Sequence, residues 1–202
     1  MDFKELGSYK EQIRRMFISN PLLIELVMPI PDSDKVEIED NFLGGNFQIR
    51  ERNPDTGLYE TRQLSLVGHL FDVPFIYTTI QDARNAICMD SSITKTSGES
   101  INEVTLQLFI MCHKANIKFS DADKIKYRKL GFFGNRLDCI VQEIGKTING
   151  SRKFGIGKML PSSNNAIVPY TPNDNFFGKI ITYRCSDFMT DFSKRAEENK
   201  WI

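Results

Sequence analysis

The chain has 202 residues, and its 26 basic and 26 acidic side chains leave no formal net charge. Proteins dedicated to nucleic acid usually carry a basic excess that neutralises phosphate, so this balance argues against that class and leaves only a locally basic face open. The 41% of hydrophobic residues are enough for a folded core. There is no signal peptide and no apolar run of about 18 residues, so we expect a soluble, cytoplasmically made protein without a membrane segment.

The N-terminal region is predicted to form two helices. Apolar residues at the spacing of one helical face run through the first part of residues 8–28. They are Tyr9, Ile13, Met16 and Phe17. Asn20-Pro21 ends this helix, because proline disfavours helical geometry at the residue before it but can begin a new turn. A short second helix therefore follows up to about Val27.

A β-hairpin is predicted in the polar segment 36–66. Asp55-Thr56-Gly57 after Pro54 is good turn chemistry between two alternating segments, at 46–52 and 58–64. These strands carry many charges, so at least one face meets solvent or a partner subunit. We interpret residues 45–66 as a protruding insertion.

The strongest strand signals lie at the centre of the chain. Residues 74–81 and 86–90 are two short strands, and residues 101–114 alternate over a longer one. Between the strands at 86–90 and 101–114, "SSITKTSGES" at 91–100 is predicted as a long polar loop. Two such strands need only a two-residue turn, and long polar tips are usually mobile or functional.

The last predicted elements are a helix at 135–150 and a strand at 176–185. Asn135 can cap the helix and Gly150 can end it. The segment between them is expected to be irregular, and the polar tail 186–202 helical. This order predicts an α+β fold, a mostly antiparallel sheet with helices packed on one face plus a protruding β-hairpin, in one domain over residues 1–190.

The stretch "GSRKFGIGKM" at 150–159 looks like a phosphate loop but fails that test. Arg152 replaces the first glycine that the pattern needs, and Met159 replaces the hydroxyl that would hold Mg²⁺. The glycines also follow a helix, whereas a phosphate loop precedes one. We expect Gly150 to close the helix, and the other two glycines to shape a turn and the start of a strand.

The cysteines and histidines do not form a recognisable reactive site. They are Cys88, Cys112, Cys139, Cys185, His69 and His113. No CxxC pair is present, so we expect buried thiols rather than a metal site. Cys112 and His113 are neighbours on a strand and point to opposite faces, and His69 is expected to be a loop residue with a local hydrogen bond. We therefore expect no catalytic, cofactor-binding or metal-binding residues, and no enzyme.

Charged groups give two further expectations. Acidic residues at 32–40 and 121–123 do not fit a calcium loop and are interpreted as solvated loops. A scattered set of basic residues can contact the DNA backbone, although we favour the interpretation that they form the exposed side of a helix and its flanks. Its members are Arg128, Lys129, Arg136, Lys146, Arg152, Lys153 and Lys158.

Several segments in this order resemble a known family. They are the "SNP" break, "FDVPFIYTTI", "ICMDSSITKTSGESINEVTLQLFIMCHK", "NRLDCIVQEI" and "FGIGKMLPSSNNAIVPYTPNDNFFGKIITYRCSDF". Together they resemble the tail-terminator and tail-completion (neck) proteins of tailed bacteriophages over most of residues 8–190. The resemblance implies a virion protein, made in the host cytoplasm, that forms a hexameric ring at the tail–neck junction. It also implies no enzymatic activity and no cofactor.

The resemblance implies partners and contact residues as well. The partners are further copies of the chain, the tail tube protein, a neck or connector protein, the sheath where the tail is contractile, and DNA passing without specific contact. The expected subunit or tube contacts are Ser92, Thr94, Lys95, Thr96, Ser97, Arg50, Arg52 and Tyr59, with Arg152, Lys153 and Lys158 facing DNA or an acidic partner. Two alternatives stay open: another head–tail connector or head-completion protein, and a DNA-binding accessory protein.

Overall fold

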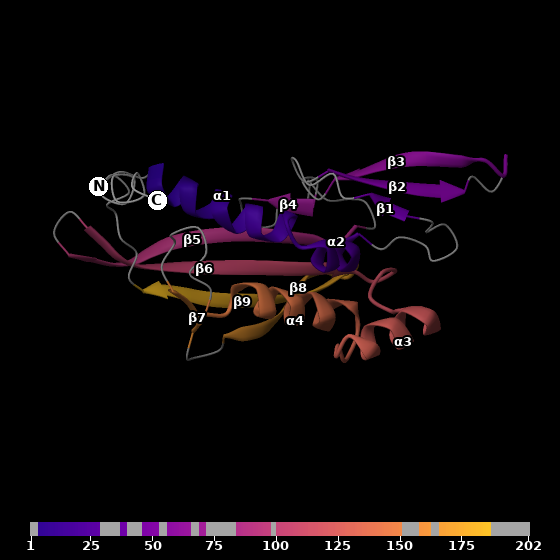
Figure 1. Cartoon of the computed structure of the whole chain (residues 1–202). Coiled ribbons are helices and arrows are strands. Elements are labelled where there is room, and N and C mark those ends of the chain that lie inside the picture. Colours follow the sequence, from indigo (N-terminus) through magenta and orange to yellow (C-terminus); the bar gives the residue numbers. More distant parts are fainter. Residues whose placement is uncertain are drawn as a thin grey trace, which may run out of the picture.

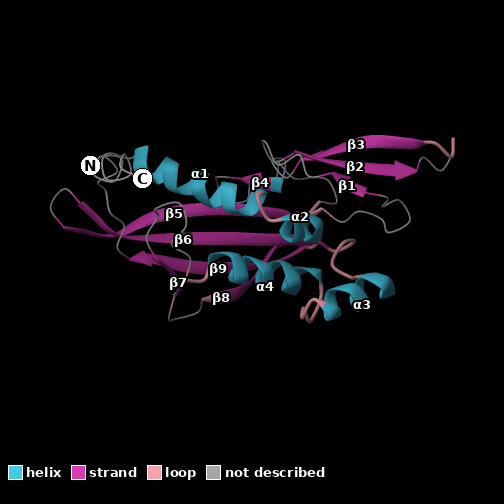
Figure 2. Ribbon diagram, in the orientation of Figure 1, coloured by secondary structure: helices cyan, strands magenta, loops and turns pink. Residues whose placement is uncertain are grey.

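In the computed structural model of the chain, helices cover one face of a long β-sheet (Figure 1). Residues 4–28, 37–39, 46–52, 56–65, 69–71, 84–97, 100–150, 158–162 and 166–186 are described. Helices α1 (Lys4–Ile18), α2 (Pro21–Val27) and α4 (Arg136–Ile148) lie over the sheet, while α3 (Asp121–Lys129) lies at one end of it (Figure 2). The predicted α+β fold is confirmed.

The main sheet has six strands and is antiparallel except at one edge. Its strands are β4 (Leu70–Phe71), β5 (Ala86–Ser97), β6 (Ser100–His113), β7 (Lys158–Pro161), β8 (Ile167–Asn173) and β9 (Phe176–Ser186). The order is β4-β5-β6-β9-β7, and β8 also pairs with β9. The long strands β5, β6 and β9 therefore form the centre on which the helices pack.

The core lies between this sheet and the helices. Alternate residues of β6 point toward the helices and are fully buried, among them Leu106, Leu108 and Ile110. The stripe of α4, including Ile140 and Ile144, packs against them in the same cluster. Burying a side chain of this size contributes about 1.5–3 kcal/mol, so this face dominates the stability of the fold.

The predicted break between the first two helices is confirmed, and Asn20 explains how it is held. The Asn20 Oδ1 accepts a hydrogen bond from the Leu23 backbone N–H at 3.1 Å, which caps α2. Its Nδ2 donates to Glu143 Oε1 at 2.7 Å and to Thr147 Oγ1 at 2.8 Å. One side chain therefore caps α2 and ties it to α4.

A second sheet contains the predicted hairpin. It has three antiparallel strands, β1 (Glu37–Glu39), β2 (Asn46–Arg52) and β3 (Tyr59–Ser65), in that order. The hairpin is confirmed, with its second strand one residue later than expected. Gly57 at the turn has a φ of +67°, the left-handed geometry that favours glycine.

Four local predictions were wrong. The polar segment 91–100 is not a loop, because β5 and β6 continue through it and leave only residues 98–99 between them. Of the two acidic segments interpreted as solvated loops, residues 121–123 begin α3, capped by Ser120, and residues 37–39 of the other form β1. The segment before the last strand is not wholly irregular, since it contains β7 and β8. Finally, the hydrogen bond of His69 is not local, because its Nδ1 lies 2.6 Å from the backbone O of Asn85, 16 residues further along the chain.

Other predictions were confirmed or fall outside the described residues. The expected helix and final strand correspond to α4 and β9. Asn135 and Asp138 form a capping box at the start of α4, and Gly150 follows its end with a φ of +69°. The expected strand at 74–81, the two glycines at 155 and 157, and the tail beyond Ser186 lie outside the described residues.

Candidate assembly surfaces

The β5–β6 hairpin carries the first group of expected contact residues. Ser92, Thr94, Lys95, Thr96 and Ser97 lie along β5, and Ser92 is exposed. In the described sheet, β9 pairs with β6 only from Glu103 onward, so the end of the hairpin is a two-stranded ribbon. It projects beyond the rest of the sheet at the left of Figure 1.

Within the described part of the chain, the outer edge of β5 is largely unpaired. Among the described strands, its only partner on that side is β4, which pairs with Ile87 and Cys88 alone. Register shifts around Lys95 mark an irregularity near the hairpin end. Such bulges twist edge strands and limit indiscriminate pairing, whereas an open edge can accept another strand. This edge is therefore a candidate contact surface.

The second group of expected contact residues lies elsewhere. Arg50 and Arg52 are on β2, and Tyr59 pairs with Arg52 from β3. This hairpin projects at the right of Figure 1, at the end opposite the β5–β6 ribbon. The structure therefore places the two groups of residues on separate surfaces, not in one site.

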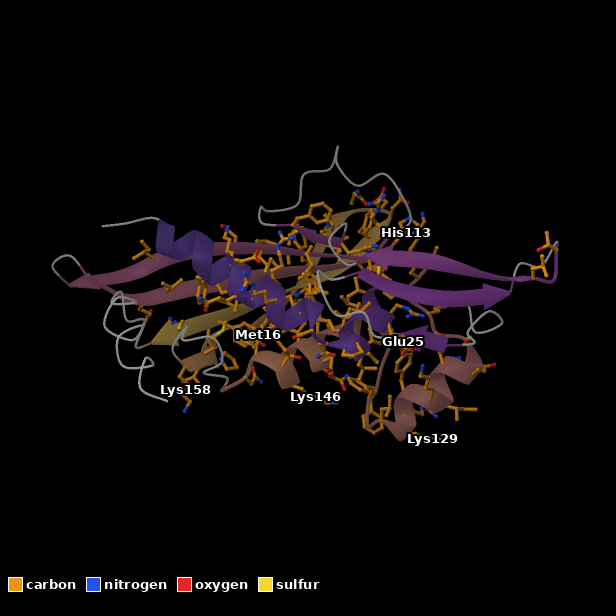
Figure 3. The ribbon with its side chains drawn as sticks, turned by 45° about the horizontal axis from the view of Figure 1, so that its top comes forward. Met16, Glu25, His113, Lys129, Lys146 and Lys158 are labelled. Carbon is orange, nitrogen blue, oxygen red and sulfur yellow. The ribbon has the colours of Figure 1, made fainter. Side chains whose placement is uncertain are left out.

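A third surface, which the sequence analysis missed, is the corner where α3 turns into α4. Tyr127 is buried between Phe119 and Phe132, and its hydroxyl donates to Glu25 Oε1 of α2 at 3.0 Å. Lys126 Nζ also contacts Glu25, which is labelled in Figure 3. Helix α3 is short, but these contacts fix it to α2.

The turn after α3 holds two adjacent phenylalanines in opposite environments. Phe132 is 1% exposed and lies under Lys146 Nζ, 3.6 Å from its ring centroid. Phe133 is 68% exposed. Its backbone is held by one side chain of α4: Gln142 Nε2 donates to Phe133 O at 2.6 Å, and Phe133 N–H donates to Gln142 Oε1 at 3.4 Å. The exposed ring is thus carried by a fixed backbone.

Glycine is required at the end of this turn. Gly134 has a φ of +101°, and a Cβ there would lie 2.4 Å from Asp138 Oδ2. Partial burial raises the pKa of Asp138, but hydrogen bonds from Lys179 Nζ, at 2.5 Å, and from the Asn135 N–H outweigh it, so the pKa is lowered. The charged carboxylate locks the turn to both α4 and β9.

The chain was compared with known proteins. The family model described as YomW matches residues 41–185, which run from before the β2–β3 hairpin into β9. The chain belongs to the YomW family. This family is phage-derived, which supports a phage-encoded protein. No curated protein and no solved structure matches the chain.

The basic residues of this YomW-family chain have different roles. Arg136 is not on an exposed helix face as expected: it is 5% exposed, 3.5 Å from Asp123 Oδ2, and its guanidinium lies over the Phe119 ring. Arg128 and Lys129 are exposed, with Lys129 near the lower edge of the molecule in Figure 3. Lys158 begins β7 and is half-buried, while residues 152 and 153 lie outside the described part.

The cysteines and histidines of the described residues are buried in the core or contact neighbouring residues of the fold. All four cysteines are buried and none forms a disulfide, and burial raises the pKa of Cys88 and Cys112 to about 12. Cys112 belongs to the helix-side core, whereas His113 stacks edge-on against Phe176 across the sheet, so the prediction of opposite faces is confirmed. Burial lowers the pKa of His69.

Within the described residues, no three His, Cys, Asp or Glu side chains are grouped to hold a metal ion. In the same part of the chain, no helix is long and apolar enough to span a bilayer.

The α3 corner was missed because its sequence signal is weak. In "DADKIKYRK" only Ile125 and Tyr127 are apolar, so the helical face is too narrow to recognise by periodicity. Ser120 before two aspartates was a usable N-cap signal. The contrast between Phe132 and Phe133 depends on the fold and has no sequence signal.

Proposed function

We propose that this YomW-family chain is a structural virion protein, the ring-forming tail terminator that joins the phage tail tube to the neck or connector. The observation that carries the proposal is the β5–β6 ribbon, which extends past β9 and has an open β5 edge. The phage-derived family and the resemblance to tail-terminator and tail-completion proteins support it.

The geometry suggests how such a ring works. An open strand edge can pair with a strand of another chain through backbone hydrogen bonds. Hydroxyl-bearing residues near the ribbon end, such as Ser92 and Thr96, can then contact the tube protein without a large apolar surface. In this proposal the neighbours are further copies, six in a ring, with the tube on one side and the connector on the other. A contractile tail would add the sheath as a partner.

The proposal is tested by shortening the ribbon. Replacing residues 94–103 with Asn-Gly, a preferred two-residue hairpin turn, keeps the Ile93–Val104 pair intact. In a phage that lacks the gene, the wild-type chain restores capped, infectious tails, and the shortened chain restores few or none. Asp174→Ala, at an exposed residue of the β8–β9 turn, serves as the surface control. Thermal unfolding monitored by circular dichroism checks that the shortened chain folds.

The location of the protein in the particle separates the alternatives. Antibody labelling at the tail–neck junction, and six-fold annuli in negative stain, are expected. Labelling at the head vertex would replace the proposal with a head-completion role. Strong, salt-dependent binding of the isolated protein to duplex DNA would instead indicate a DNA-binding accessory protein. Full rescue by the shortened chain would contradict the role of the ribbon.

A further inference from the structure

The α3 corner presents apolar side chains that nothing in the described structure covers. We define the α3 platform as Ile125, Arg128, Lys129, Leu130 and Phe133. Its three apolar members are 60%, 49% and 68% exposed respectively. Fixed, exposed aromatic residues are typical anchors of protein interfaces, because little conformational entropy is lost when they bind. Phe133 has this character, since Gln142 and the Gly134 turn hold its backbone.

The platform is also positively charged. Residues 124–136 contain five basic residues and no acidic one. Lys124, Lys126 and Arg136 are offset by Asp121, Glu25 and Asp123 respectively. Arg128 and Lys129 make no ion pair with any residue that the structure describes. Their charges are therefore available beside the exposed apolar groups.

The tip of the β2–β3 hairpin has the complementary character. Leu58 is 68% exposed at the turn. Residues 51–60 contain three acidic residues and one basic residue, and Glu51 of β2 is the register partner of Glu60 of β3. Each seven-residue strand spans roughly 23 Å, so the tip extends well beyond the body of its own chain.

We infer that the α3 platform binds the β2–β3 hairpin tip of a second copy of this chain. The tip and α3 lie apart in both views of the molecule, so this contact joins separate copies (Figure 1, Figure 3). Leu58 packs against Phe133 and Leu130, and Glu51 and Glu60 lie opposite Arg128 and Lys129. Charged groups beside an apolar centre orient the two copies and exclude wrong registers.

The contact between tip and platform is one subunit contact of the proposed ring, and its biological role rests on the proposed function. Each copy has one tip and one platform, so a head-to-tail contact can continue from copy to copy until it closes. The contact differs from the open β5 edge, which lies on another part of the molecule. The two surfaces can therefore be tested separately.

Cysteine cross-linking tests the contact directly. Thr56→Cys places a thiol beside Leu58, and Lys129→Cys places one beside Leu130, while the apolar residues stay in place. The four native thiols are buried, which keeps the background low. After mild oxidation, the double variant is expected to give a ladder of covalent oligomers on a non-reducing gel. The matched control combines Thr56→Cys with Asp174→Cys, an exposed site on the β8–β9 turn. Equal yields from the two pairs would overturn the inference.

Charge exchange provides the second test. Arg128→Glu with Lys129→Glu, or Glu51→Lys with Glu60→Lys, should each weaken self-association by about tenfold or more, measured by sedimentation velocity. A chain carrying all four changes should associate again. Failure of the combined variant to recover, with each variant still folded by circular dichroism, would contradict the contact.

The outcome can be separated from that of the proposed function. Cross-linked closed dimers instead of longer ladders would keep the contact but remove the ring. Specific cross-linking together with absence of the protein from tails would keep the contact and refute the terminator role. Capped tails without cross-linking above the control would keep the terminator role and refute the contact between tip and platform.

Discussion

Two of the described hairpins, β5–β6 and β2–β3, project from the molecule, and they are supported in different ways. β5–β6 is part of the main sheet, flanked by β9 and covered by helices, whereas the one described strand beside β2–β3 is the three-residue β1. Buried side chains fix the register of the first hairpin, because a one-residue slip would turn its apolar face away from the core. The second hairpin has a turn at Gly57 that suits glycine and continuous register pairs between its two strands. Core packing and turn chemistry are thus separate ways of holding a projecting ribbon.

The largest expected difference comes from removing core contacts. Leu106→Ala on β6 should lower the free energy of unfolding by about 2–5 kcal/mol, because it leaves a cavity in the fully buried layer. Leu58→Ala, at the exposed tip of β2–β3, should change it by less than about 0.5 kcal/mol. Urea denaturation measures both. Comparable losses would mean that the second hairpin is packed as tightly as the first.

Alkaline pH should destabilise the core of the main sheet, to which the first hairpin belongs. β5 and β6 contain Cys88 and Cys112, and β2–β3 contains no cysteine. Burial raises the pKa of both thiols from about 9 to about 12, so the folded state keeps protons that the unfolded state loses. The contribution of each thiol to the free energy of unfolding is therefore fully present below pH 9. It falls as the pH rises toward 12, by about 1.4 kcal/mol per pH unit for each thiol.

Denaturation between pH 9 and 10 measures this slope. Cys112→Ala should make it shallower, whatever its effect on stability at neutral pH. An unchanged slope would show that Cys112 does not contribute to the alkaline loss.

A smaller loss than that of Leu106→Ala is expected from Gly57→Ala at the turn of the second hairpin. Gly57→Ala places a Cβ on a residue with a φ of +67°, which costs about 1 kcal/mol. The loss should be local, with faster hydrogen exchange of β2 and β3 amides and unchanged exchange in β5 and β6. Gly145→Ala in α4 is the matched control, since its Cβ would meet only Asn149 Nδ2 at 3.7 Å and should be neutral or stabilising. Equal acceleration in both hairpins would contradict their independence.

The sequence predicted elements wherever one local signal was strong. The stripe and cap of α4, the Asn20-Pro21 break and the turn at Gly57 each depend on neighbouring residues, and each was placed within one or two positions. The polar part of β5 was missed because its strand structure comes from pairing with β6, not from its composition. β8 was missed because Pro169 and Pro172 argue against a central strand, and it is in fact an edge strand beside β9.

The candidate surfaces were less predictable than the fold. Arg136 looked like a surface charge, but it is buried because Asp123 and Phe119, from a segment interpreted as a loop, meet it in space. The exposure of Phe133 also depends on Gln142, nine residues further along the chain. The contacts expected at Ser92, Arg50 and the other residues named with them remain predictions.

Asn20 links the residues before the family match to residues inside it. The YomW match begins at residue 41, yet the Asn20 side chain bonds Glu143 and Thr147 inside the matched region. Phe17, Leu23 and Leu26 are among the side chains of the same core, all with no exposed surface. A protein begun at residue 41 would lack one wall of that core. The matched segment is therefore shorter than the unit that folds, and the preceding residues complete it.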